Sequence, residues 1–293
     1  MASLREIKSR IKAVKSTAKI TKAMQMISAS KMVKAQMRSN SAYPYAQSLS
    51  ELIKDLDNLS DYSNPLLLQR PTKKIGILII GSSRGFVGGM ITALKVKIAE
   101  HITQLENEAS NLEFSTITLH KEGLKISEQL DLRNDYHFAK FIDNPTSTNI
   151  SAIKKVVCDS FINLQYDKIY IAYTYFKSVI KQEPTIEQLL PVPIDLKNSG
   201  DRNNKTFVYE PDVKTILDLL IPEYIENQIF SALLNSIASE YSARMVAMKS
   251  ATDNANELND KLSLYYNRTR QSNITKEITE IVSASKSKKK KLT

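Results

Sequence analysis

The feature that most constrains this chain is the absence of helix-breaking residues at both of its ends. No glycine or proline follows Pro222, and the first of either along the chain is Pro44, where a kink is expected. Glycine and proline are the residues that most often end a helix, so both ends are predicted to form long helices. One helix over residues 223–285 would be about 95 Å long, about twice the width of a compact domain of this mass. Such a helix must project.

The two predicted helices carry matching stripes with alternate spacings of three and four residues. The C-terminal stripe consists of Tyr241, Arg244, Met248, Ala251, Ala255, Leu258, Leu262 and Tyr265. The N-terminal stripe runs through Leu4, Ile7, Ile11, Val14 and Ala18, and then turns toward Ile20, Met24 and Ile27. This spacing is typical of a left-handed coiled coil. The simplest arrangement pairs the two ends of the chain as antiparallel helices.

The middle of the chain alternates between strand-like and helix-like segments. The predicted strands cover residues 73–80, 114–120 and 168–176, and the predicted helices cover 90–106, 124–130 and 150–164. This alternation predicts an open, Rossmann-like α/β sheet inserted between the two coiled-coil helices. The expected domains are a helix over 1–60, the α/β domain over 72–200, a helix over 210–285 and a basic tail over 286–293.

The net charge of +10 is concentrated at the two ends of the chain. Residues 1–40 hold ten Lys and Arg against one acid, and residues 276–293 hold six Lys against two Glu. Basic ends of this kind are expected to meet an acidic partner, such as nucleic acid, anionic lipid or carboxylate-rich protein loops. The single cysteine, Cys158, excludes a disulfide framework and is expected in the core. No run of about 18 apolar residues exists, so no membrane span is predicted.

The stretch GSSRGFVGG at residues 81–89 follows a predicted strand and precedes a predicted helix, where a phosphate loop would lie. It lacks the Gly-Lys-Ser/Thr ending of a P-loop and the spacing of a dinucleotide fingerprint. Two other interpretations are a glycine turn at a sheet edge and an exposed loop that offers Arg84 to a partner. The three histidines have no metal-ligand spacing, and no nucleophile or zinc motif appears.

Three long segments carry a family resemblance. In chain order they are ITKAMQMISASKM at 20–32, RMVAMKSATDNANEL at 244–258 and NRTRQSNITKEITEIVSA at 267–284. The first two resemble the N-terminal and C-terminal signatures of the gamma subunit of rotary, F-type, proton-translocating ATP synthases, and the third is similar to the closing segment of that family. The resemblance covers essentially the whole chain.

The resemblance implies a non-catalytic rotor subunit without a cofactor. In this family the terminal helices form a coiled coil inside a hexameric head of alpha and beta subunits. The α/β domain stands with the epsilon subunit on the membrane ring of proton-carrying subunits. The subunit transmits rotation between that ring and the catalytic sites on beta. The implied location is the cytoplasmic face of the bacterial inner membrane, as a peripheral protein; the basic start has no cleavage-like break, which disfavours an organelle.

The resemblance also implies roles for particular positions. Met24, Arg244, Gln271 and Thr275 match family positions implicated in contact with the head and in coupling. Arg84 matches the basic residue of a loop that approaches an acidic segment of beta. The family's loop usually reads Ser-Asp-Arg-Gly-Leu-Cys-Gly-Gly, so Ser83 here replaces an acid and Val87 a cysteine.

Two other classes of function are compatible with parts of the sequence. A basic coiled-coil protein could bind nucleic acid, although its lysines are not interleaved with aromatic residues and no groove-reading module is visible. A nucleotide-using α/β enzyme would place its ligand at residues 81–89. The first would show salt-dependent affinity for duplex DNA, and the second saturable nucleotide binding by the isolated chain.

Overall fold

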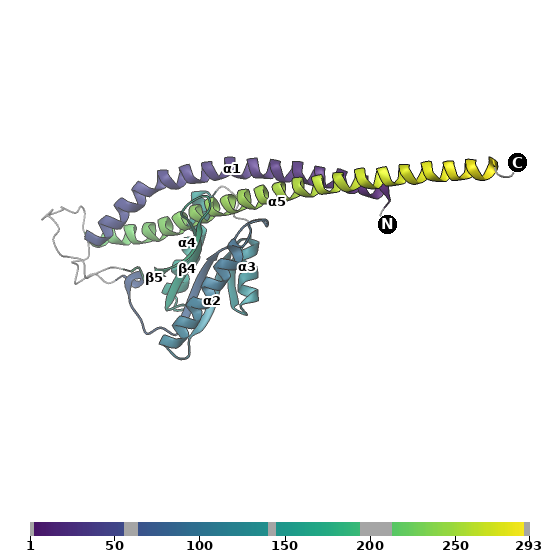
Figure 1. The fold of residues 1–293 in the computed structure, drawn as a ribbon. Coiled ribbons are helices and arrows are strands. Elements are labelled where there is room, and N and C mark those ends of the chain that lie inside the picture. Colours follow the sequence, from purple (N-terminus) through teal and green to yellow (C-terminus); the bar gives the residue numbers. More distant parts are fainter. Residues whose placement is uncertain (1–2, 56–63, 140–144, 194–212, 290–293) are drawn as a thin grey trace. The chain divides into compact units, whose positions relative to one another are not determined.

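A computed structural model describes residues 3–55, 64–139, 145–193 and 213–289 (Figure 1). The chain divides into two units, one made of Met1–Ile27 with Met245–Thr293 and the other of Ser28–Arg244. Two long helices, α1 (Leu4–Asp55) and α5 (Val213–Lys289), continue from one unit into the other. The predicted fold class, long terminal helices with an inserted α/β domain, is therefore confirmed. Helix α1 continues past Pro44, and α5 continues into the segment assigned to a tail.

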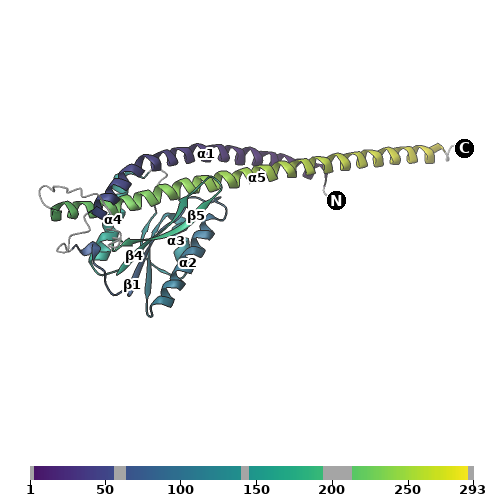
Figure 2. The ribbon, with the colours of Figure 1, turned by 60° about the vertical axis from the view of Figure 1, so that its left-hand side comes forward.

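The described part of the Ser28–Arg244 unit contains one five-stranded sheet with the strand order β3-β2-β1-β4-β5. Figure 2 labels three of its strands, β1, β4 and β5. Its strands are β1 (Lys74–Ile80), β2 (Glu113–Leu119), β3 (Arg133–Phe138), β4 (Lys168–Phe176) and β5 (Gln182–Leu190). The first four strands are mutually parallel, and β5 is antiparallel to β4. The order 3-2-1-4 is that of doubly wound α/β folds, in agreement with the Rossmann-like prediction.

The two outer strands, β3 and β5, were not predicted from the sequence. Strand β3 reads RNDYHF and β5 reads QEPTIEQLL, and neither contains a run of apolar residues. Both lie at edges of the sheet, where a strand pairs on one side only. An edge strand tolerates charged residues and a proline such as Pro184, because its outer backbone groups are not needed for pairing.

Aliphatic side chains and one tyrosine, from the sheet and two helices, form the core on one side of β1. Helices α2 (Met90–Glu108) and α3 (His120–Gln129) contribute to a buried cluster. Its members are Ile75, Ile77, Ile79, Leu94, Ile98, Ile126, Tyr170 and Ala172. The intervening residues Leu78, Ile117 and Ile171 are also buried, so both faces of the sheet are covered.

Helix α4 (Ser147–Ile162) contacts β4 and buries Ile153, Val157 and Phe161. Cys158 lies on this helix and is half-buried rather than fully in the core. Burial raises the pKa of its thiol to about 11. The cysteine therefore stays protonated and weakly nucleophilic at neutral pH.

Helix α5 is almost entirely buried over residues 232–244, all within the Ser28–Arg244 unit. Three serines with a spacing of three residues face the end of β4 and the turn that follows it. Ser236 Oγ accepts from the backbone N–H of Thr174 (3.2 Å), and Ser239 Oγ donates to the carbonyl of the same residue (3.1 Å). Ser242 Oγ donates to the carbonyl of Val179 (2.7 Å). These short side chains let the helix approach the strand closely while satisfying its backbone groups.

In the unit made of Met1–Ile27 and Met245–Thr293, α1 and α5 pack as an antiparallel pair (Figures 1 and 2). The Oγ1 atoms of Thr21 and Thr252 are 2.7 Å apart, and both side chains are buried. The inward residues follow a heptad spacing and are Leu4, Ile7, Ile11, Val14, Ala18 and Thr21 on α1, and Met248, Thr252, Ala255, Asn259, Leu262 and Tyr266 on α5. The predicted coiled coil is therefore present.

The predicted register of this seam was wrong at four positions. Ile20, Ile27, Leu258 and Tyr265 were expected inside, but between 47% and 58% of each residue is exposed. On α5, Met248, Ala255 and Leu262 lie in the seam as predicted. The seam positions between and after them are Thr252, Asn259 and Tyr266, each one residue later than the predicted Ala251, Leu258 and Tyr265. The prediction assumed that the apolar residues face the partner helix. The two helices instead bury the hydrogen-bonded pair Thr21 and Thr252 and leave several apolar side chains exposed.

The last described part of α5 has no other described segment of the chain packed against it. All side chains over 271–283 are exposed. They include Ile274, Ile278, Ile281 and Val282, which fall on one face of the helix. None of the helices in the described parts of the chain combines the length and the apolar character needed to cross a bilayer.

Gly81, which follows β1, is predicted to tolerate no side chain. A Cβ atom at this position would lie 2.1 Å from the backbone nitrogen of Gly123 in α3. His120 Nδ1 also donates to the Gly81 carbonyl over 3.0 Å, which holds the two segments together. Gly81→Ala should therefore lower the free energy of unfolding by about 2–4 kcal/mol in urea denaturation.

Gly85→Ala is the matched control, because a Cβ atom there would meet nothing within 4 Å. It should change the free energy of unfolding by less than about 1 kcal/mol. Equal losses for the two substitutions would contradict the close contact at Gly81.

Candidate functional site: the glycine loop and the buried pair on α5

The glycine loop, residues 81–89, connects the carboxyl end of β1 to the start of α2. Strand β1 lies between β2 and β4, so the strand order reverses direction next to this loop. In doubly wound folds this is the position where ligands bind. The loop is therefore the first place to look for a functional site.

Two side chains of α5 occupy this position. Glu240 and Arg244 are 5% and 6% exposed, and they form an ion pair with 2.7 Å between Arg244 Nη2 and Glu240 Oε1. Arg244 also donates to the loop backbone, from Nε to the Gly85 carbonyl (3.2 Å) and from Nη2 to the Arg84 carbonyl (3.0 Å). The Arg244 guanidinium thus binds two carbonyl oxygens of the loop backbone and fixes the loop to α5.

Glu240 holds the beginning of the same loop. Its carboxylate accepts from the backbone N–H of Ser83 (3.1 Å) and from Ser83 Oγ (3.0 Å). Here Ser83 supplies a donor, whereas an acid at this position would face the Glu240 carboxylate. The N–H of Ser83, one of the loop donors that a phosphate could use, is already bound to an internal anion. This arrangement disfavours the nucleotide-binding interpretation of the loop.

The rest of the loop directs two side chains outward. Arg84 is exposed, and its carbonyl accepts from both Arg244 and Ser82 Oγ. Phe86 is 69% exposed and has a φ angle of 64°, which is uncommon for an aromatic residue. Val87 is buried and anchors the loop from inside. A fixed loop with an exposed arginine and an exposed aromatic side chain is suited to contact a partner.

The pair on α5 is also linked to α1 within the same unit. The Arg244 guanidinium lies 5.7 Å from the centre of the Tyr241 ring. Lys31 Nζ donates to Tyr241 Oη over 3.3 Å. The loop, α5 and α1 are therefore connected through Arg244, Tyr241 and Lys31.

The structure brings together two of the five site residues predicted from the sequence, Arg84 and Arg244. The other three belong to the unit made of Met1–Ile27 and Met245–Thr293. Met24 is half-buried on α1, while Gln271 and Thr275 are exposed on α5 and joined by a bond from Thr275 Oγ1 to the Gln271 carbonyl (2.9 Å).

Sequence reasoning missed Glu240, which is central to the loop. An acid four residues before an arginine on a predicted helix is a recognised ion-pair spacing, and it could have indicated this residue. Among the residues that the structure describes, no group of three or more His, Cys, Asp and Glu side chains could hold a metal ion.

Comparisons with known proteins agree on one family. A family model described as ATP synthase matches residues 3–287. A protein of Psychrobacter sp. (strain PRwf-1) named ATP synthase gamma chain is 39% identical over 288 residues, which are 96% of this chain and 98% of the relative. A protein of the same name from Dehalococcoides mccartyi (strain CBDB1) is 40% identical over 286 residues, with the same coverage of both chains.

Solved structures share the fold at lower identity. A chain of the Euglena gracilis mitochondrial ATP synthase rotor in rotational state 1 aligns with a TM-score of 0.62 and 16% identity, covering 92% of this chain and 98% of its own. A second Euglena gracilis structure, described as OSCP/F1/c-ring in rotational state 3, gives 0.68 and 18%, with 97% and 94% covered. The fold of these chains therefore extends over the two helices and the sheet together.

Arg244→Ala is predicted to release the glycine loop. It removes the donors to two loop carbonyls and leaves the Glu240 carboxylate buried without its cation. The free energy of unfolding should fall by about 3–5 kcal/mol. Amide hydrogen exchange over residues 82–88 should become faster than in the rest of the sheet.

Lys249→Ala is the control for this prediction, because Lys249 is a basic and exposed residue of the same helix. It should change the free energy of unfolding by less than about 0.5 kcal/mol. Unchanged exchange over 82–88 in the Arg244 variant would show that other contacts fix the loop.

Proposed function

Because the chain belongs to the ATP synthase gamma chain family, we propose that it is the central-stalk rotor subunit of a proton-translocating ATP synthase. It couples proton flow through a membrane ring to ATP synthesis on the beta subunits of the alpha/beta head. It contributes no catalytic residue itself. The observation that carries this proposal is the full-length similarity, with about 39% identity over 96% of the chain.

The exposed end of α5 supports a place inside the head. Residues 271–283 present Ile274, Ile278 and Ile281 on one face, with between 47% and 68% of each exposed. An apolar stripe of this kind on a helix is normally covered by a partner. A sleeve formed by alpha and beta subunits would cover it, with Gln271 and Thr275 on the same stretch of helix.

The outward residues of α1 extend the same argument. Ile20, Met26 and Ile27 are each at least 58% exposed, although they lie on a helix whose other side is a packed seam. Met24 lies among them. We assign these residues, with Met24, to contact with the head. The basic character of residues 1–40 fits carboxylate-rich loops of beta, through exposed pairs that salt would weaken.

The glycine loop supports a contact of a different kind. Arg84 and Phe86 project from a backbone held by Glu240 and Arg244. We assign Arg84 to an acidic segment of beta and Arg244 to the support of that contact. A rigid loop loses little conformational entropy on binding, so even a single exposed ion pair can be formed at low cost.

The remaining partners are the epsilon subunit and the membrane ring, which the α/β domain would contact. The corresponding location is the cytoplasmic face of a bacterial inner membrane, as a peripheral protein. Neither alternative function has comparable support. At the glycine loop the N–H of Ser83 already donates to Glu240, and the basic α1 is explained by acidic protein loops without nucleic acid.

Purification of the tagged chain from gently solubilised membranes tests the proposal as a whole. The expected result is that alpha, beta, epsilon and ring subunits are identified in the same preparation. Recovery of the chain from membranes without alpha and beta subunits, under conditions that preserve the complex, would contradict the assignment.

Arg84→Ala should lower coupled ATP synthesis by inverted membrane vesicles roughly two- to fivefold, the effect of losing a contact worth up to about 1 kcal/mol. The substitution keeps the Arg84 carbonyl, so the loop remains anchored by Arg244. Lys97→Ala, an exposed lysine on the neighbouring helix α2, is the control and should leave synthesis unchanged. An unaltered rate in the Arg84 variant at normal assembly would remove Arg84 from the coupling contact.

A further inference from the structure

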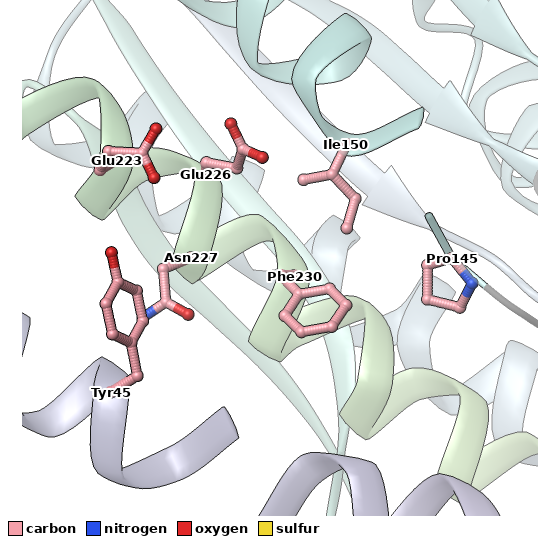
Figure 3. A pocket seen from close by; sticks show the side chains of 7 residues that line it. All are labelled: Tyr45, Pro145, Ile150, Glu223, Glu226, Asn227 and Phe230. Atoms are coloured by element: carbon pink, nitrogen blue, oxygen red, sulfur yellow. The ribbon is translucent and has the colours of Figure 1, made fainter. Parts of the chain in front are cut away.

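A cavity of about 260 Å³ lies between α1, α4 and α5 in the Ser28–Arg244 unit and shares no residue with the glycine loop (Figure 3). Its lining residues are Tyr45, Pro145, Ile150, Glu223, Glu226, Asn227 and Phe230. The volume is slightly below the range of about 300–1,000 Å³ that is usual for small-molecule sites. Its walls combine apolar and aromatic groups with a few polar ones, as ligand pockets do.

One polar group in this cavity lacks a partner. Asn227 is 7% exposed, and its Nδ2 atom has no hydrogen-bond acceptor among the described residues. Figure 3 shows its amide between the rings of Tyr45 and Phe230 in this view. A buried amide donor without an acceptor is destabilising, so it is rarely kept without a reason. An acceptor atom on a bound molecule would satisfy it.

The two carboxylates of the cavity, Glu223 and Glu226, differ in their capacity to accept further hydrogen bonds. Glu226 is occupied, because Ser151 Oγ donates to both of its oxygens (3.2 and 3.1 Å) and Lys154 forms an ion pair with it. Glu223 lies 3.5 Å from Lys154 Nζ, and 51% of its side chain is exposed. Burial alone would lower the pKa of Lys154, but its hydrogen bond and charge attraction to Glu226, together with Glu223, raise it. The lysine therefore stays charged.

The polar groups that this leaves for a ligand are the Asn227 amide donor, the Glu223 carboxylate and the Tyr45 hydroxyl; the first two, a donor and an acceptor, lie on α5. These two residues are four positions apart, which places them on the same side of the helix. Apolar surface from Ile150 and Phe230 lies next to them. A primary carboxamide has a matching arrangement, because its carbonyl accepts while its NH₂ group donates.

We propose that this cavity binds a small molecule that carries a primary carboxamide on an apolar body. The carbonyl of the ligand accepts from Asn227 Nδ2, and its NH₂ group donates to the Glu223 carboxylate. The apolar body packs against Ile150 and Phe230. A carboxylate ligand would meet the negative charge of Glu223, so the site discriminates against it. This inference does not depend on the proposed function.

Titration of the full chain with benzamide, followed by ligand-observed NMR, tests the proposal. Saturable binding is expected, and benzoate should bind about tenfold more weakly because its charge repels Glu223. Asn227→Leu should weaken benzamide binding about fivefold, the effect of one lost hydrogen bond. The control Asn254→Leu changes an exposed asparagine of the same helix and should bind like the unmodified chain.

Three results would overturn the proposal: no saturable binding of benzamide, equal binding of benzoate, or unchanged benzamide binding by the Asn227→Leu variant. If circular dichroism shows that this variant does not fold, Asn227→Asp removes the same donor with little change of shape. Retention of benzamide affinity by Asn227→Asp would equally exclude the assigned hydrogen bond.

Discussion

The contact between α5 and the end of β4 is the interaction on which the Ser28–Arg244 unit depends. Ser236 and Ser239 bind both backbone groups of Thr174, so the helix axis can lie close to the strand. Since β4 is the neighbour of β1, this approach also brings α5 to the loop that follows β1. Glu240 and Arg244 lie on the same stretch of helix and reach that loop. A bulkier residue at either serine would move the ion pair away from the loop.

A buried ion pair is a poor source of stability, because the cost of removing two charges from water can exceed their attraction. The pair formed by Glu240 and Arg244 is better explained by the geometry that it imposes. Its two side chains satisfy the N–H of Ser83 and the carbonyls of Arg84 and Gly85. These groups belong to a loop that contains a positive φ angle at Phe86 and would otherwise adopt many conformations. The charges therefore fix one loop conformation, and a hydrophobic pair of equal volume could not do so.

The elements that were predicted correctly from the sequence are those marked by the absence of glycine and proline or by a run of apolar residues. The two long helices followed from residues without glycine or proline, and β1 and β4 followed from continuous apolar segments. Strands β3 and β5 could not be predicted in this way, because edge strands are specified by their neighbours and carry polar residues. The register of the seam was also predicted wrongly, because Thr21 and Thr252 are buried as a hydrogen-bonded pair. This pair becomes evident only when the two helices are seen together. Arg84 and Arg244 were identified by resemblance, whereas Glu240 needed the fold, which brings it to Ser83 over 157 positions of sequence.

One buried pair of hydroxyl groups in an otherwise largely apolar seam links the packing of the coiled coil to the proposed rotation. Hydroxyl groups inside the seam make their bond at one register only, so Thr21 and Thr252 resist sliding of one helix along the other. Apolar contacts, in contrast, have no fixed direction and can be exchanged between neighbouring positions. Ile20, Ile27 and Ile278 lie on the outside, where a subunit that turns against its surroundings must change partners repeatedly. The hydrogen bond within the pair is directional, whereas the apolar contacts around the pair are not. Together they let the two helices stay paired while their contacts with a surrounding head change.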